Sequence, residues 1–282
     1  MDVIRTTDEM QQISRAGKRA GRRIGLVPTM GCLHEGHLSL VRLAREKADV
    51  VVVSIFVNPI QFLPGEDFAA YPRPYGEDET LCREAGVDVL FYPEASAMYV
   101  PGHSVTVEER NLSRGLCGAS RPGHFSGVTT VVAKLFNIVL PDVAIFGQKD
   151  AQQARIILRM VRDLNIPVAI VLGPIVREKD GLAMSSRNRY LSPPERREAL
   201  CLYRSLREAE RMVGEGERSV ETIRAAMTAI INAMPLARMD YLEFVDDRTL
   251  LPVARIGGPV LVAVAVKFGK TRLIDNIVLT SA

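Results

Sequence analysis

The feature that most constrains the fold is a regular alternation of apolar runs and amphipathic segments through the first two-thirds of the chain. The apolar runs are strand-length and rich in valine and isoleucine, which is typical of strands buried on both faces of a parallel sheet. The pattern predicts a doubly wound, Rossmann-like α/β domain, in which ligands bind at the carboxyl ends of the strands. The predicted strands are 24–28, 49–57, 87–93, 141–147 and 167–176, and the predicted helices are 37–48, 76–86, 126–140 and 150–165.

The pattern changes after Val176. Helices are predicted at 191–213, which opens on a serine and two prolines that suit a first helical turn, and at 219–234. Strand-like segments follow, and we expect them to pair as adjacent antiparallel strands. We therefore predict two domains, residues 1–176 and a smaller C-terminal α+β domain, residues 177–282. The strand-like segments of the second domain are 240–247, 260–269 and 271–279.

Composition excludes several classes of protein. The net charge of +3 is too small to indicate a nucleic-acid or anionic-membrane partner. The four cysteines lie far apart without zinc spacing, so we expect reduced thiols in the cytoplasm. The apolar runs are too short to span a bilayer, and the polar first residues do not form a secretory signal. A cytoplasmic protein without nucleic-acid or membrane partners is expected.

The loop after the first predicted strand, Val27–Leu40, holds two histidines three residues apart. It leads into a helix, and the N–H groups and dipole of a helix N-terminus bind phosphates. Gly31 and Gly36 allow close backbone approach, and His34 and His37 share one face of the first turn. A phosphate site is predicted. The alternatives are a zinc site, whose H-E-x-x-H pattern needs histidines one residue further apart, and histidines that merely cap the helix.

The loop at the end of the second predicted strand, 56–62, offers neutral amides. Asn58 and Gln61 could hydrogen-bond a hydroxyl or a carboxylate of a substrate. The alternative is a turn in which Asn-Pro simply ends the strand.

Two further loops carry cations. In residues 146–153, Lys149 could contact phosphate and Asp150 could contact a ribose or cap the following helix. In residues 183–195, Arg187 could match phosphate oxygens bidentately beside two serines. The alternatives are a solvated Lys–Asp pair and a plain hinge with surface arginines.

Other nucleotide motifs are incomplete. The segment "FGKT" resembles the tail of a P-loop, but Val264 stands where the first glycine belongs. "VAVK" has neither the glycine-rich loop nor the H-R-D of a kinase. The first strand is followed by no G-x-G-x-x-G, and the chain holds no G-x-S-x-G, so dinucleotide oxidoreductase and α/β-hydrolase interpretations are disfavoured.

Taken together, these loops resemble the pantoate–β-alanine ligases of the nucleotidylyl transferase superfamily. "PTMGCLHEGHLSL" is similar to the family's form of the His-x-Gly-His signature. "SIFVNPIQF", "YPRP", "RPGHFSGV", "FGQKDAQQ" and "MSSRNRYLS" follow in the family's order and approximate spacing. The resemblance covers nearly the whole chain. The last motif stands where related synthetases carry Lys-Met-Ser-Lys-Ser, here without a lysine.

The resemblance implies a ligase that forms an amide bond in pantothenate biosynthesis. Pantoate and ATP would give pantoyl adenylate and diphosphate, and β-alanine would then displace AMP. ATP as co-substrate, Mg²⁺ and a homodimer are also implied. Mg²⁺ would bind mainly through the ATP phosphates. Glu77 and Asp78 could support it indirectly, although a solvated helix start is the favoured interpretation of these two carboxylates.

The resemblance also assigns residues. His37 matches the family's proton donor, and His34, Lys149 and Arg187 would act with it on the phosphates. Gln61, Gln153 and Asn58 would hold pantoate, with Gln61 also near β-alanine. Arg121 and His124 match "RPGHFSG" without a defined role. The ATP residues implied are Met30, Gly31, Cys32, Leu33, His34, Glu35, Gly36, His37, Gly147, Gln148, Lys149, Asp150, Val176, Met184, Ser185, Ser186 and Arg187.

Three other functions compete with this interpretation. A nucleotidylyltransferase with a phosphorylated acceptor would need further cations where the loops offer neutral amides. A metal-dependent hydrolase would be built on His34 and His37. RNA binding is disfavoured by the small net charge and by the lack of an anticodon-type domain.

Overall fold

The computed structural model describes residues 1–280, and within that range the chain forms a six-stranded and a three-stranded sheet. The chain divides into two compact units. The first unit comprises residues 1–114, 121–148 and 153–174. The second unit comprises residues 115–120, 149–152 and the chain from Ile175 onward. Each unit therefore contains segments that are distant in the sequence.

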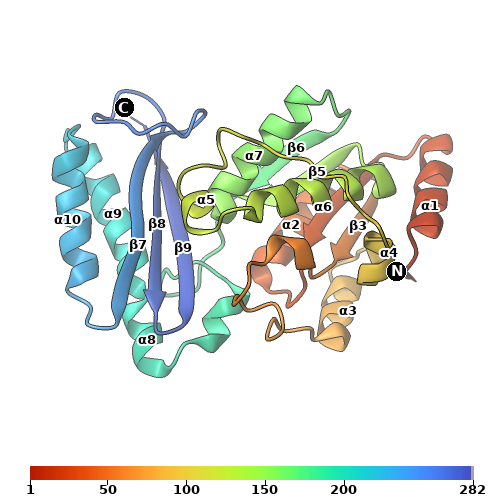
Figure 1. Ribbon diagram of the computed structural model, residues 1–282, viewed down its shortest axis with the longest axis horizontal. Coiled ribbons are helices and arrows are strands. Elements are labelled where there is room, and N and C mark those ends of the chain that lie inside the picture. Colours follow the sequence, from red (N-terminus) through yellow and green to blue (C-terminus); the bar gives the residue numbers. More distant parts are fainter. Residues whose placement is uncertain (281–282) are drawn as a thin grey trace. The chain divides into compact units, whose positions relative to one another are not determined.

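The first unit is built on a parallel sheet with the strand order β1-β4-β3-β2-β5-β6, in which β3, β5 and β6 are labelled in Figure 1. From β2 the chain builds the sheet outward through β3 and β4, and then returns to the other side of β2 for β5 and β6. The order thus reverses between β2 and β5, which is where doubly wound folds bind their ligands. The strands are β1 (Asp2–Ile4), β2 (Ile24–Thr29), β3 (Val50–Ile55), β4 (Val89–Phe91), β5 (Val143–Gly147) and β6 (Ala169–Gly173).

Both faces of this sheet are buried, as the apolar runs predicted. Val51 and Val53 pack in one cluster with side chains of the following helices, and Val52, which points the opposite way, is also buried. The predicted fold class is confirmed. The helices of the first unit include α1 (Thr7–Arg19), α2 (Glu35–Arg45), α3 (Tyr75–Glu84), α4 (Ala95–Met98), α6 (His124–Val139), most of α7 (Ala151–Asp163) and the short 3₁₀ helix η1 (Pro59–Gln61). The 3₁₀ helix η2 (Gln148–Asp150) begins in the first unit and continues into a segment of the second.

The sequence pattern did not predict the first strand or the first helix. β1 is three residues long and adds to the sheet edge beside β4. In α1 only Met10 and Ser14 are buried, and the segment is polar on the whole, so few apolar residues mark it as a helix. Its start follows ordinary capping chemistry, because Thr6 Oγ1 accepts from Glu9 N.

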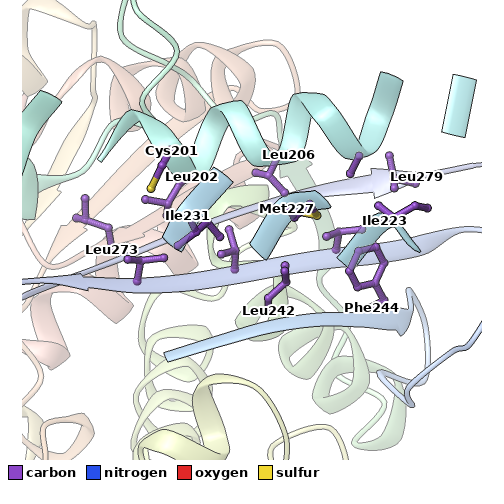
Figure 2. Packing of buried hydrophobic residues seen from close by; sticks show 14 of the residues in the cluster. Cys201, Leu202, Leu206, Ile223, Met227, Ile231, Leu242, Phe244, Leu273 and Leu279 are labelled. Atoms are coloured by element: carbon purple, nitrogen blue, oxygen red, sulfur yellow. The ribbon is translucent and has the colours of Figure 1, made fainter. Parts of the chain in front are cut away.

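The second unit packs two helices on an antiparallel sheet, β7 (Ala237–Asp246), β8 (Val260–Phe268) and β9 (Thr271–Leu279). The side chains between α9 (Leu200–Gly214), α10 (Val220–Asn232) and the sheet form its core (Figure 2). The helix predicted at 191–213 is in fact two, α8 (Pro193–Glu198) and α9, and Ser192 caps the first of them with Glu195. The remaining short elements are α5 (Cys117–Ser120) and η3 (Ser186–Tyr190).

Core residues of the second unit come from both helices and the sheet. Burial of such apolar side chains is the main favourable term in folding. Between residues 1 and 280, no helix has the length and apolar character needed to cross a membrane. The labelled core residues are Cys201, Leu202, Leu206, Ile223, Met227, Ile231, Leu242, Phe244, Leu273 and Leu279 (Figure 2).

Candidate functional site

The two histidines of the opening loop cap α2. His34 Nδ1 accepts from Gly36 N at 3.1 Å, and His37 Nδ1 accepts from His34 N at 3.3 Å. The ring centroids lie 4.1 Å apart. Because each Nδ1 accepts a backbone N–H, each neutral imidazole carries its proton on Nε2. The histidines therefore cap the helix, as the alternative interpretation predicted. The capping hydrogen bonds also fix both rings in the tautomer that donates from Nε2. Phosphate binding by these rings stays a prediction.

A buried carboxylate holds the preceding loop. Asp78, in the first turn of α3, accepts from Cys32 N at 2.8 Å and from Leu33 N at 2.7 Å. Asp78 is only 2% exposed, so the predicted solvated position is wrong for this residue, although Glu77 beside it is exposed. Cys32 and Leu33 lie in the loop between β2 and α2, outside both elements. By accepting their backbone N–H groups, the carboxylate holds this turn in place.

The turn itself needs glycine at one position. Gly31 has a φ of 83°, and a Cβ atom there would lie 2.8 Å from Asp78 Oδ2. Gly31 N donates to Thr29 Oγ1, and the Cys32 side chain is buried at a φ of 51°. Sequence reasoning missed Asp78 because an acidic residue in the first turn of a helix is ordinary and its partners lie 45 and 46 residues away.

The loop after β3 brings two predicted amides together with the first loop. Asn58 Nδ2 donates to Gln61 Oε1 at 3.0 Å, and Gln61 Nε2 donates to Met30 Sδ at 3.3 Å. Asn58 is 1% exposed and Gln61 is 9% exposed. Tyr99, which sequence reasoning did not single out, donates its hydroxyl to Asn58 Oδ1 at 2.7 Å. Asn58 is thus enclosed by protein partners, whereas Gln61 reaches the loop of β2.

Helix α6 supports this loop. A Cβ at Gly127 would lie 2.7 Å from both the N and Cα atoms of Gln61, so only glycine permits this contact. His124 Nδ1 lies 2.8 Å from Gln61 O, and Arg121 NH1 lies 2.9 Å from His124 Nε2. Because a guanidinium can only donate, the Arg121 contact calls for an acceptor at His124 Nε2, and the Gln61 carbonyl calls for a donor at Nδ1. The "RPGHFSG" motif therefore positions the Gln61 backbone.

Arg121 of the same motif also holds the segment after Gln61, through an ion pair with Glu66. Arg121 pairs bidentately with Glu66, Nε to Oε1 at 2.6 Å and NH2 to Oε2 at 2.7 Å. Burial raises the pKa of Glu66, but hydrogen bonds from Arg121 and Leu63 N outweigh it and lower that pKa. Glu66 is a third residue that sequence reasoning missed, after Asp78 and Tyr99.

The loop after β5 lies next to the β2 loop at the carboxyl edge of the sheet, since β2 and β5 are paired neighbours. Gly147 ends β5, and Gln148 Oε1 accepts from Arg155 at 2.7 Å. Gln153 is half-buried in α7, and Asp150 is exposed. The predicted residues of the first unit, from 30–37, 58–61, 147–148 and 153, thus follow three adjacent strands.

In the second unit, the predicted ATP-binding residues after 175 lie on one hairpin and at the start of the 3₁₀ helix η3 that follows it. Met184 N donates to Val176 O at 3.0 Å, so residues eight apart in sequence are neighbours. Ser185 caps η3, its Oγ accepting from Arg187 N at 3.3 Å. Ser186 is buried. Val176 and Met184 thus lie side by side just before the start of η3, which holds Ser186 and Arg187, and ATP binding by these residues stays a prediction.

This hairpin is anchored by a buried ion pair. Arg177 contacts both carboxylate oxygens of Asp275, at 2.6 and 3.1 Å. Burial raises the pKa of Asp275, and Arg177 opposes that shift. Asn276 next to it donates to Lys149 O at 2.9 Å, which fixes the backbone of the predicted phosphate-binding lysine.

The cysteines show no sign of chemistry. Cys32, Cys82 and Cys201 are buried, Cys117 is half-buried, and none of the four is in a disulfide. Burial raises the pKa of the Cys82 and Cys201 thiols to about 12. Within residues 1–280, histidine, cysteine and acidic side chains form no group of three or more placed to hold a metal ion.

Comparison with known proteins gives a consistent result. A family model described as pantoate-beta-alanine ligase matches residues 2–278. The pantothenate synthetase of Heliobacterium modesticaldum is 59% identical over 278 residues, which is 99% of each chain. A crystal structure of pantothenate synthetase from Thermus thermophilus superposes with a TM-score of 0.94 at 45% identity, covering 98% of this chain and 99% of that one. The pantoate-beta-alanine ligase of Francisella tularensis, solved as a complex with beta-gamma ATP and beta-alanine, has a TM-score of 0.83 at 33% identity, covering 99% and 97%.

Proposed function

The chain belongs to the pantoate-beta-alanine ligase family, and we propose that it joins its substrates through a pantoyl adenylate. It is an enzyme that condenses pantoate with β-alanine in an ATP-dependent reaction. In the proposed first step a carboxylate oxygen of pantoate attacks the α-phosphorus of ATP and diphosphate leaves. In the second step the neutral amine of β-alanine attacks the acyl carbon, AMP leaves, and the amine nitrogen loses a proton. The products are pantothenate, AMP and diphosphate.

The first step needs little base catalysis. A carboxylate is already ionised at neutral pH, so the barrier lies in bringing two anions together and in the charge that gathers on diphosphate. Positioned N–H donors and fixed positive charge are the means that meet this demand. The loop after β2 offers both backbone N–H groups at the start of α2 and two imidazoles that donate from Nε2.

The His34–His37 arrangement is the observation that carries the proposal. Backbone N–H groups hold both rings through Nδ1, so neither ring must reorganise before it donates to a phosphate oxygen. We assign His37 as the proton donor and His34 as its partner. Met30, Gly31 and the backbone of residues 32–36 would line the nucleotide, and Asp78 would hold that backbone in place through Cys32 and Leu33.

The acid is assigned to the amides. Gln61 and Gln153 would hydrogen-bond pantoate, and Gln61 would also lie near β-alanine. Asn58 is enclosed by Tyr99, Gln61 and Gly127, which supports a role in positioning Gln61 rather than in direct contact with substrate.

The remaining assignments rest on the family resemblance. Gly147, Gln148 and residues of the second unit would bind ATP, with Lys149 and Arg187 as the catalytic cations. The second unit would act as a lid that excludes water from the acyl adenylate. The second-unit residues assigned to ATP are Lys149, Asp150, Val176, Met184, Ser185, Ser186 and Arg187.

We also propose that Mg²⁺ is required and that it binds mainly through the ATP phosphates. Mg²⁺ prefers oxygen ligands, whereas the loops of the site present N–H groups, imidazoles and cations. The ion would therefore take its ligands from the substrate phosphates and from water. When bound, it would neutralise charge on the leaving diphosphate. The same resemblance supports a homodimer in the cytoplasm. Sedimentation of the purified protein tests whether it is a dimer.

Isotope transfer tests the adenylate directly. Pantoate labelled with ¹⁸O in its carboxyl group should deliver one labelled oxygen to AMP, because the attacking oxygen stays on phosphorus when β-alanine displaces AMP. Unlabelled AMP, with pantothenate still formed, would overturn the adenylate route. Transfer of label to inorganic phosphate would instead indicate an acyl phosphate intermediate.

A further inference from the structure

We propose that Tyr99 is a positioning residue for pantoate recognition. Acting through Asn58, it holds the Gln61 side chain with its amide nitrogen toward the Met30 loop. The inference rests on the proposed binding of pantoate by Gln61, and it adds to that proposal a residue that would act without touching pantoate, β-alanine or ATP.

The three side chains form one directional series of hydrogen bonds. Tyr99 OH donates to Asn58 Oδ1 at 2.7 Å, Asn58 Nδ2 donates to Gln61 Oε1 at 3.0 Å, and Gln61 Nε2 donates to Met30 Sδ at 3.3 Å. Tyr99 lies 41 residues beyond Asn58, just after α4, so the fold alone brings it to the β3 loop.

A backbone carbonyl sets the direction of the series. Asn58 Nδ2 lies 3.1 Å from Gly127 O, and a carbonyl oxygen can only accept, so the nitrogen of the Asn58 amide must face it. The second N–H of that nitrogen then points to Gln61, whose oxygen must accept it. Gln61 is left with its nitrogen on the opposite side, and the Asn58 oxygen must receive a donor, which is the tyrosine hydroxyl.

Burial makes this direction costly to reverse. Asn58 is 1% exposed and Gln61 is 9% exposed, so water does not replace a lost partner easily. Burial also raises the pKa of Tyr99, which keeps its hydroxyl protonated and donating at neutral pH. The Tyr99 ring packs against His103 with centroids 5.0 Å apart and against Phe56 at 6.1 Å, so its position does not depend on the hydroxyl.

The chemical consequence concerns pantoate oxygens. An amide nitrogen aimed at the site donates to a carboxylate or hydroxyl oxygen, whereas a reversed amide would present an oxygen to another oxygen. Tyr99 therefore favours the Gln61 orientation that recognises an oxygen-rich acid. Without the hydroxyl, Asn58 Oδ1 loses its buried donor and the orientation of both amides loosens.

The Tyr99→Phe variant tests this, because it removes one oxygen atom and keeps the ring. We expect the KM for pantoate to rise about 5- to 150-fold, which is the range for one buried polar partner lost. The KM for ATP and kcat should change by less than about twofold, since uniform binding of one substrate is what is removed. Asn58→Ala, which removes the middle of the series, should raise the KM for pantoate at least as much.

A matched control and a double-mutant cycle separate positioning from a general structural effect. Tyr92→Phe removes the same hydroxyl from another half-buried tyrosine of this unit, whose ring packs on Tyr75, and should leave the KM for pantoate unchanged. In a Gln61→Ala background, Tyr99→Phe should add no further rise, because residues that act as one unit are not additive.

Each outcome decides the matter. An unchanged KM for pantoate in a folded Tyr99→Phe variant, or a rise that multiplies fully in the Gln61→Ala background, overturns the role of Tyr99. A Gln61→Ala variant with an unchanged KM for pantoate overturns instead the proposed contact of Gln61 with the acid, and the role of Tyr99 falls with it. Thermal unfolding of each variant confirms that the fold is retained.

Discussion

Gly31 and Asp78 are packed so closely that a Cβ atom on residue 31 would lie 2.8 Å from Asp78 Oδ2. The glycine turns the chain out of β2 with a positive φ, and the aspartate accepts the next two backbone N–H groups. The turn that delivers both histidines to the start of α2 is therefore built from the backbone conformation of Gly31 and the buried charge of Asp78.

Replacing Gly31 with alanine should destabilise the enzyme by more than its strained φ alone. The left-handed conformation costs about 1–2 kcal/mol for a residue with a Cβ, and the contact with Asp78 adds to that cost. Gly21→Ala is the matched control, because Gly21 has a φ of 72° with nothing within 4 Å of the added atom. Urea unfolding measures both, and equal losses in free energy would contradict the close packing.

Replacing Asp78 with asparagine should impair ATP use. The amide places a donor where one backbone N–H needs an acceptor, and a lost charge-assisted hydrogen bond costs about 1.5–3 kcal/mol. We expect the kcat/KM for ATP to fall by about 10- to 100-fold, which is that cost expressed as a ratio. The exposed Glu84→Gln at the end of α3 is the control. Normal kinetics in Asp78→Asn would show that the loop does not need this carboxylate.

His37→Ala should lower kcat by about 10²- to 10³-fold while the protein stays folded, as expected for one lost donor to transition-state charge. Because His37 also accepts from His34 N, the variant loses a capping contact. His37→Asn keeps a short side-chain acceptor and lacks the imidazole Nε2–H. Equal impairment of both variants in a steady-state assay supports the proton-donor role, whereas full activity in His37→Asn would reduce the role of His37 to capping.

The Glu66–Arg121 pair should stabilise the fold in a pH-dependent way. The pKa of Glu66 is lower in the folded state than its ordinary value of 4.5. A carboxyl with a lowered folded pKa contributes stability that is present above its unfolded pKa and is lost as the pH falls through the folded pKa. Glu66→Gln should therefore be less stable than the native chain at pH 7, and the difference should shrink below pH 4.5. A difference in the free energy of unfolding that stays constant from pH 7 down to about pH 3, well below that ordinary pKa, would rule this out.

Local pattern was enough to predict the framework of the first unit. Apolar runs such as Val50–Ile55 mark strands whatever their neighbours are, and the His34–His37 spacing is visible without a structure. Capping chemistry likewise located the helix that begins after Ser192. β1 and α1 escaped prediction because one is three residues long and the other buries only Met10 and Ser14.

The supporting residues of the site could not be found in this way. Asp78 resembles any acidic residue at a helix start, and Tyr99 resembles any tyrosine ahead of a turn; both act on partners more than 40 residues away. Their roles depend on which strand ends meet at one edge of the sheet, and that is a property of the strand order. Asn58 shows a different limit: its residue type suggested a ligand contact, which stays a prediction, and nothing in the sequence indicated its hydrogen bond to Gln61 or its burial.

The most direct test of the account is pantoate-dependent exchange of labelled diphosphate into ATP, with Mg²⁺ present and β-alanine absent. We expect exchange in the native enzyme, because adenylation is reversible and precedes the attack of the amine, and we expect strongly reduced exchange in His37→Ala. Pantothenate formation without any such exchange would contradict a separate adenylation step at the His34–His37 loop.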